Sequence, residues 1–249
     1  GIISSNFTAI VDKILKGESF TDCLNFLEKK AKNKYPDATT GAINNCRGRW
    51  FEVLLTYLCN YQVRNSNLLF LKLGTASEHS IFDIFLDTDK QLKTLLAQGH
   101  SLNLSIPDLI VLNIESIPDL KKWKTELCDL STKTQGKEIT AKILAGYQNL
   151  IKNPVVFDRC KALCSIKTSL RPDRKYQSMY EAEFVKTFQK RFFPKNKINP
   201  KYIMVGPLEA KATIAILEKN LSLISIASDG TAELQPTIDK VCIVNNIKN

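Results

Sequence analysis

The chain has 249 residues, of which 44% are hydrophobic, so it is long enough to bury a substantial core, and we expect a single domain over 1–249. Its 35 lysines and arginines outnumber its 25 aspartates and glutamates, and the net charge of +10 favours an anionic partner such as nucleic acid or an acidic membrane surface. The sequence contains no leader-like start and no run of about 18 apolar residues, so we expect no membrane span and a cytoplasmic location.

The seven cysteines are scattered and form no Cys-x-x-Cys pair. This pattern is typical of reduced intracellular thiols that serve as small core residues. Only His79 and His100 could join them in a zinc site, and neither has suitable spacing. The sequence therefore argues against zinc and against disulfides.

The first 65 residues or so are predicted to be mainly helical. Residues 4–33 show helical spacing of apolar side chains, and Ser19 or Thr21 could begin the second part of this segment. A longer helix is predicted from about Thr40 to Gln62, because large apolar residues recur there at steps of three and four. These residues are Trp50, Phe51, Leu54, Leu55 and Leu58. Glu52 lies near the polar boundary of that stripe.

The sequence from about 100 to 249 alternates strands and helices. Residues 101–112 first alternate and then become continuously apolar, which predicts a strand with Asp108 at its entry. Two polar helices parted by Gly136 follow over 119–152. The strands expected after these helices span 155–157, 162–169, 201–205, 221–227 and 240–244. Helices are expected from Pro172 to about Gln189 and over 207–220. This alternation predicts an α/β class with a mixed sheet covered by helices on both faces.

The segment from Ser165 to Glu181 concentrates residues suited to cutting DNA. Hydrolysis of a phosphodiester commonly uses a metal ion held by carboxylates, and Asp108 and Glu181 are the candidates here. Magnesium suits oxygen ligands of this kind. Lys167 could stabilise the charge that develops on phosphorus. Each residue alone has an ordinary alternative: a Pro-Asp turn for Asp108, a solvated strand end for Lys167 and a solvated helix surface for Glu181.

Arg171, Asp173 and Arg174 are candidates for base recognition. Arginine can donate two hydrogen bonds to guanine, and aspartate can accept one from the amino group of cytosine, so the three suit adjacent G·C pairs. The alternative is an ordinary helix N-terminus, in which Asp173 interacts favourably with the helix dipole.

The run Lys167-Thr-Ser-Leu-Arg171-Pro-Asp173-Arg174, followed by Tyr176-Gln177 and then Glu181, resembles the catalytic and recognition segment of type II restriction endonucleases that cut sites with a CCGG core, within the PD-(D/E)xK nuclease superfamily. The resemblance implies a restriction-endonuclease-like fold. It also implies that Asp108 and Glu181 hold the metal, with Ser165 at the position where most of the superfamily has an acid. Glu52 in Arg47-Gly-Arg-Trp-Phe-Glu52 is similar to the helix acid that family members use near a metal-bound water.

A second Pro-Asp pair, Pro118-Asp119, lies nearer to Lys167 in the sequence. We prefer Asp108, because a buried strand follows it, whereas the residues after Asp119 are typical of a helix.

The resemblance implies Mg²⁺-dependent cutting of double-stranded DNA before the first cytosine, which leaves a four-nucleotide 5′ overhang. A palindromic site implies a homodimer, and the sequence does not decide between a dimer and a tetramer. Gln62, Arg64 and Asn65 are guesses for contacts to flanking bases. Two other hypotheses are a repair or mobile-element nuclease of the same superfamily and a non-catalytic DNA-binding protein.

Overall fold

The structure is a computed structural model. It describes residues 1–74, 98, 107–130, 135–152, 157–169, 172–192, 200–207, 217–219 and 236–245, except for the side chains of 149–152, 172–173 and 191–192. Arg171, His79, His100 and the predicted strand over 221–227 lie outside these ranges, as does most of the predicted helix over 207–220, of which 217–219 are helical.

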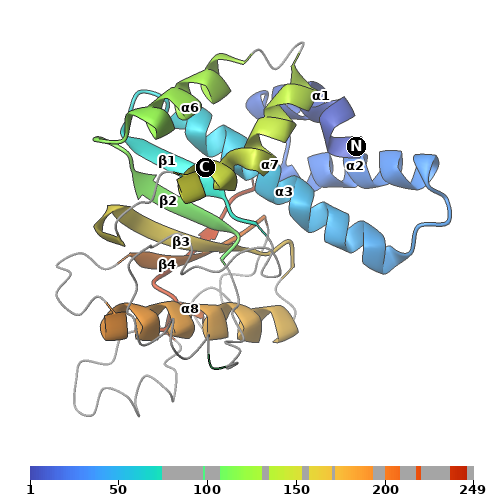
Figure 1. The fold of residues 1–249 in the computed structure, drawn as a ribbon. Helices are drawn as coiled ribbons and strands as arrows, with labels where there is room; N and C mark the ends of the chain where they lie inside the picture. The colour runs from blue at the N-terminus through green and yellow to red at the C-terminus, as the bar shows by residue number, and fades with distance from the viewer. Residues whose placement is uncertain are drawn as a thin grey trace.

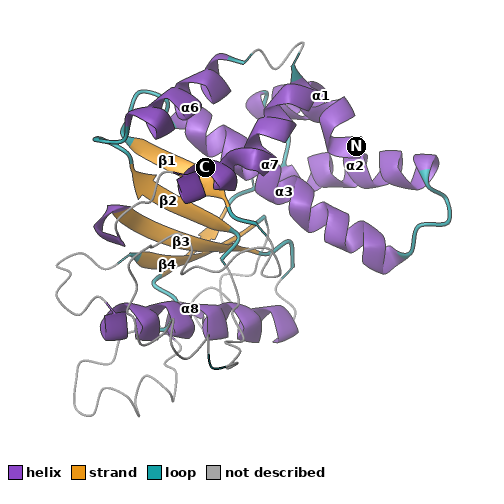
Figure 2. Ribbon diagram, in the orientation of Figure 1, coloured by secondary structure: helices purple, strands orange, loops and turns teal. Residues whose placement is uncertain are grey.

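A mixed sheet forms the centre of the protein, as the sequence predicted (Figure 2). In spatial order its strands are β1 (Leu68–Lys72), β2 (Leu109–Asn113), β3 (Cys160–Ile166), β4 (Lys201–Gly206) and β5 (Lys240–Ile243). The β1–β2 and β2–β3 pairs are antiparallel, and the β3–β4 and β4–β5 pairs are parallel. Because β2 and β3 run in opposite directions, the start of β2 lies beside the end of β3.

Helices lie on both faces of this sheet (Figure 1). The described helices are α1 (Ile2–Leu15), α2 (Phe20–Lys34), α3 (Thr40–Gln62), α6 (Pro118–Asp129), α7 (Gly136–Lys152) and α8 (Pro172–Phe192). Helix α8 packs beside β4 on one side, while α3 and α7 contact β1 and gather with α1 on the other. The helical N-terminal part is confirmed.

Local capping explains where the N-terminal helices begin. The hydroxyl of Ser19 accepts a hydrogen bond from the backbone N–H of Asp22 and caps α2. Thr39 caps α3 in the same way through the N–H of Ala42. The predicted bounds of α3 are confirmed, and its apolar stripe is buried in the core. The first half of α3 is mostly exposed, whereas nearly every residue from Trp50 to Asn60 is buried.

The structure differs from the prediction in three places. Strand β1 was not predicted. Phe157 belongs to a short 3₁₀ helix, Phe157–Arg159, rather than to a strand. Strand β3 ends at Ile166, so the prediction of a strand to residue 169 was wrong, and Lys167 stands just beyond the strand.

All seven cysteines are free thiols. Cys23, Cys160 and Cys164 are buried, as expected for core residues, whereas Cys59, Cys128 and Cys242 are only partly buried and the exposed Cys46 contradicts that expectation. Within the described residues, no helix combines the length and the apolar character needed to cross a membrane.

Candidate active site

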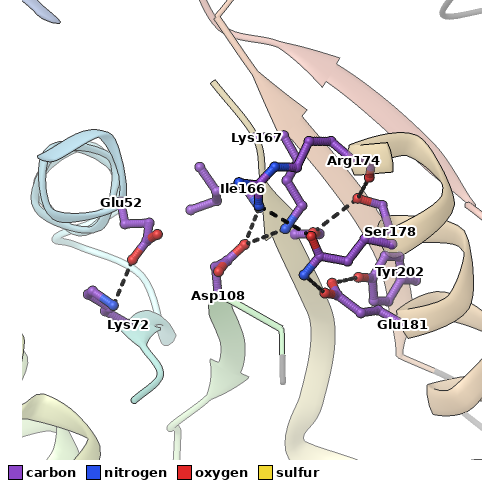
Figure 3. Close-up of polar contacts among 11 residues, drawn as sticks. Glu52, Lys72, Asp108, Ile166, Lys167, Arg174, Ser178, Glu181 and Tyr202 are labelled. Atoms are coloured by element: carbon purple, nitrogen blue, oxygen red, sulfur yellow. Dashed lines mark hydrogen bonds and ion pairs between the residues drawn. The ribbon is translucent and has the colours of Figure 1, made fainter. Parts of the chain in front are cut away.

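Asp108 and Lys167 meet where β2 begins and β3 ends. The backbone N–H of Asp108 donates to Cys164, and the N–H of Ile166 donates a 2.6 Å hydrogen bond to Oδ2 of Asp108. Nζ of Lys167 lies 3.4 Å from the same oxygen. Residues 59 positions apart are thus brought together by the antiparallel register of the two strands. Figure 3 shows both side chains pointing into one site.

The Asp108 carboxylate sits in an environment that disfavours its charge. Burial is the main cause that raises its pKa to about 6, and the neighbouring Glu52 and Glu181 carboxylates add to it. Lys167 and the Ile166 N–H act in the opposite direction. A perturbed carboxyl beside a lysine that is only 7% exposed is typical of a functional site.

Glu181 reaches the site from α8 and is only 1% exposed, so the alternative of a solvated helix residue is wrong. Its Oε2 accepts a 2.7 Å hydrogen bond from the hydroxyl of Tyr202 on β4, and its Oε1 accepts a 2.9 Å hydrogen bond from Gln177. The sequence analysis gave no role to Tyr202, and it quoted Gln177 in the motif without giving it a role. Gln177 could have been suspected, since it lies one helical turn before Glu181.

Ser165 is fully buried in β3 and faces α8. Its hydroxyl lies 3.2 Å from the hydroxyl of Ser178, and Ser178 donates to the backbone oxygen of Arg174. The position that the family resemblance marks as vacated by an acid is therefore used to join β3 to α8.

Glu52 extends from α3 toward the same site and is held by a lysine that the sequence analysis missed. Oε2 of Glu52 lies 2.7 Å from Nζ of Lys72 at the end of β1, and both side chains are 13% exposed. Lys72 also donates to the backbone oxygen of Leu73. The apolar run from Leu68 to Leu73 was the available indication of this strand.

A cleft of about 500 Å³ is bordered by Glu52, Asp108 and Lys167. It is lined by polar residues from α3, by Asp108, by the segment that leaves β3 and by α8: Asn44, Asn45, Arg47, Gly48, Arg49, Glu52, Asp108, Ile166, Lys167, Thr168, Ser169, Arg174 and Gln177. Glu181 does not line it, but Gln177, which donates a hydrogen bond to Glu181, does. The cleft thus has α3 on one side and α8 on the other (Figure 3).

Of the three recognition candidates, the structure places one side chain. Arg174 lines the cleft, and its Nη1 lies 3.4 Å from Oε1 of Gln177. Asp173 is in the first turn of α8, but its side chain is not described, and Arg171 lies outside the described residues.

Asp119, the alternative acid, is exposed in the first turn of α6, beyond the far end of β2. The candidates for flanking contacts, Gln62, Arg64 and Asn65, do not line the cleft; Arg64 instead stacks over the ring of Tyr61.

The donor set suits a hard divalent cation. Asp108, Glu181 and Glu52 supply carboxylate oxygens, and Oδ1 of Asp108 accepts no hydrogen bond from the residues described. Among those residues, no three His, Cys, Asp or Glu side chains are already gathered as metal ligands. Lys72 and Tyr202 each hold one of the carboxylates instead.

Comparison with known proteins agrees with this geometry. Residues 3–248 match the model of the Cfr10I/Bse634I restriction endonuclease family. Type II restriction enzyme Cfr10I of Citrobacter freundii is 24% identical over 222 residues, which are 83% of this chain and 75% of that enzyme.

Two solved structures of Bse634I restriction endonuclease share the fold. One aligns with a TM-score of 0.65 at 22% identity and covers 92% of this chain and 82% of the other. The second, Type IIF restriction endonuclease Bse634I with cognate DNA, aligns with a TM-score of 0.68 at 21% identity and covers 92% and 83%.

Proposed function

The chain belongs to the Cfr10I/Bse634I restriction endonuclease family, and from this premise we propose that it is a Mg²⁺-dependent enzyme that cuts double-stranded DNA at a palindromic site containing CCGG. The observation that carries the proposal is the meeting of Asp108 and Lys167 in a polar cleft that Arg174 also lines. We further propose that 1–249 is one nuclease domain and that it acts in the cytoplasm.

Asp108 and Glu181 would hold the metal, and Glu52 would stand beside it. When bound, the ion supplies positive charge for the phosphate and lowers the pKa of water. Lys167 adds a cation next to Asp108, where it can stabilise negative charge on the reacting phosphate inside a partly desolvated cleft. Ser165 supports the site from behind by linking β3 to α8 through Ser178.

Recognition of the DNA sequence would come from residues around the start of α8. Arg171 and Arg174 would donate to guanine and Asp173 would accept from cytosine, so that one copy of the chain contacts half of the CCGG core. A palindromic site then requires two copies related by a two-fold axis, which supports a homodimer, with a tetramer as a possible further assembly. By family resemblance, the cut falls before the first cytosine and leaves a four-nucleotide 5′ overhang.

Incubation with Mg²⁺ and plasmid DNA, followed by sequencing of the ends, tests the proposal. We expect discrete fragments with CCGG at every end and no cutting in EDTA. A smear would favour a nuclease without site choice, and intact plasmid would favour a non-catalytic DNA-binding protein. Asp108→Asn and Lys167→Ala should abolish cutting while DNA binding is largely kept. Asp119→Asn is the matched control and should cut normally.

A further inference from the structure

One face of α3 lines the cleft without a role in the proposed chemistry. Asn44, Asn45, Gly48 and Arg49 border the opening, and Glu52 lies one turn further along the same helix. Steps of three and four residues place these positions on one side of a helix. We call the first four residues the α3 track. The track lies on the same helix as Glu52, and Arg174 on α8 lies across the site from Glu52 (Figure 3).

Neither the backbone conformation nor the packing of the described residues requires a glycine at position 48. It lies in the interior of a 23-residue helix, where glycine is less stabilising than alanine. The only described glycine with positive φ is Gly17, so Gly48 is not needed for its backbone conformation. A Cβ built on Gly48 would meet nothing within 4 Å, so no close packing of the described residues requires glycine either. The missing side chain instead leaves open space at the surface of the cleft.

Arg49 presents a cation to the same space. It is exposed, and among the residues described it forms no ion pair with a carboxylate. Arg47, two positions earlier, shows the contrast, since its Nη1 lies 2.8 Å from both Glu28 and Asn25 on α2. Both arginines line the cleft, but Arg47 is also held by α2 and stabilises its packing on α3, whereas Arg49 has no such ion pair among the residues described.

We propose that the α3 track is a second DNA-contacting surface, which binds the sugar-phosphate backbone on the side of the cleft opposite α8. Gly48 allows a phosphate to approach the helix closely, and Arg49 with the amides of Asn44 and Asn45 donates hydrogen bonds to phosphate oxygens. Such contacts hold the duplex in register but carry no sequence information. The track therefore contributes affinity and positions the bond to be cut, and this inference rests on the proposed function.

A pair of glycine variants tests the role of Gly48. Gly48→Ala should keep or raise the melting temperature, because alanine favours the helix, yet weaken binding to a labelled duplex in EDTA at least tenfold, equally for DNA with and without CCGG. The matched control is Gly41→Ala on the same helix, where a Cβ would meet only the hydroxyl of Thr39 at 3.9 Å and which does not line the cleft. Its affinity should equal that of the unchanged protein.

A second pair of variants tests the positive charge of Arg49. Arg49→Gln should weaken binding to both duplexes and reduce the slope of log affinity against log salt concentration by about 1, as expected for one lost phosphate contact. Lys16→Gln removes the same charge from an exposed site outside the cleft and should leave the slope unchanged.

Normal DNA affinity in Gly48→Ala, or a salt slope in Arg49→Gln equal to that of Lys16→Gln, would overturn the role of the track even if the unchanged protein cuts DNA at discrete sites. Absence of such cutting by the unchanged protein would instead contradict the proposed function. The two failures are therefore distinguishable.

Discussion

The hydroxyl of Tyr202 on β4 donates a 2.7 Å hydrogen bond to Glu181 on α8, and both side chains are buried. Burial and the adjacent carboxylate raise the pKa of Tyr202 well above its ordinary value, so the phenol stays protonated and acts as a donor. Together with the amide of Gln177, it fixes both oxygens of Glu181. The candidate metal ligand is therefore oriented by the protein itself.

Tyr202→Phe should destabilise the protein by about 1–3 kcal/mol, because a buried carboxylate oxygen loses its donor. Urea unfolding at pH 7 measures this, and the rate of DNA cutting should fall in parallel. Tyr176→Phe is the control, since that hydroxyl is on the same helix as Glu181 but its side chain is 71% exposed. Equal stability of the two variants would contradict the role of this hydrogen bond.

Gln177 connects a recognition candidate to a metal-ligand candidate. Its amide oxygen lies 3.4 Å from Arg174, and its amide nitrogen donates to Glu181. Gln177→Leu should slow single-turnover cutting about tenfold, the equivalent of one hydrogen bond to a charged group, with a smaller effect on DNA binding in EDTA. An equal loss of binding and cutting would show that Gln177 acts only through DNA affinity.

The ion pair between Lys72 and Glu52 is mostly buried, so removing one partner should cost more than removing both. Lys72→Met leaves the Glu52 carboxylate without its cation and should destabilise the protein by about 3 kcal/mol. The double variant Lys72→Met with Glu52→Gln should recover a large part of that loss. A double-mutant cycle from urea unfolding provides the measurement. Purely additive effects would show that the pair contributes no coupling.

The raised pKa of Asp108 predicts how the stability of the metal-free protein depends on pH. The folded-state pKa of about 6 exceeds the reference value of 3.8, so the folded state binds the proton more tightly. Stability should therefore fall as pH rises from 4 to 6, by up to about 3 kcal/mol from this one group, and stay level above.

Asp108→Asn cannot ionise and should lack this loss, so it should be more stable than the unchanged protein at pH 8 in EDTA. Added Mg²⁺ should narrow the difference by binding the ionised carboxylate. Thermal unfolding across pH 4 to 8 checks both statements. Parallel pH profiles of the two proteins would contradict the assignment.

The assignment of base contacts predicts a loss of site choice rather than of affinity. Asp173→Ala should cost about 1–3 kcal/mol of discrimination at the cytosines of the core. The cutting rates on CCGG and on single-substitution sites give this value directly. Unchanged discrimination would mean that Asp173 serves only the N-terminus of α8, and the same series with Arg174→Ala would test the guanine contact.

The local sequence pattern was sufficient to predict where the long helices lie. The apolar stripe and the threonine before residue 40 determine where α3 lies, because helical periodicity and capping depend on residues a few positions apart. Strand β1 was missed because it is only five residues long, which is too short for its apolar pattern to identify a strand. It is held by pairing with β2, and that pairing joins Leu68 to Asn113.

The sequence by itself determined the family, the order of most elements and the residue types at the site: two carboxylates, a lysine and the arginines and aspartate around the start of α8. Only the tertiary structure decided that Lys72 holds Glu52, that Tyr202 and Gln177 hold Glu181, and that α3 lines one side of the cleft. The physical reason is that most of these contacts depend on strand register and on packing between distant segments, which local periodicity does not encode.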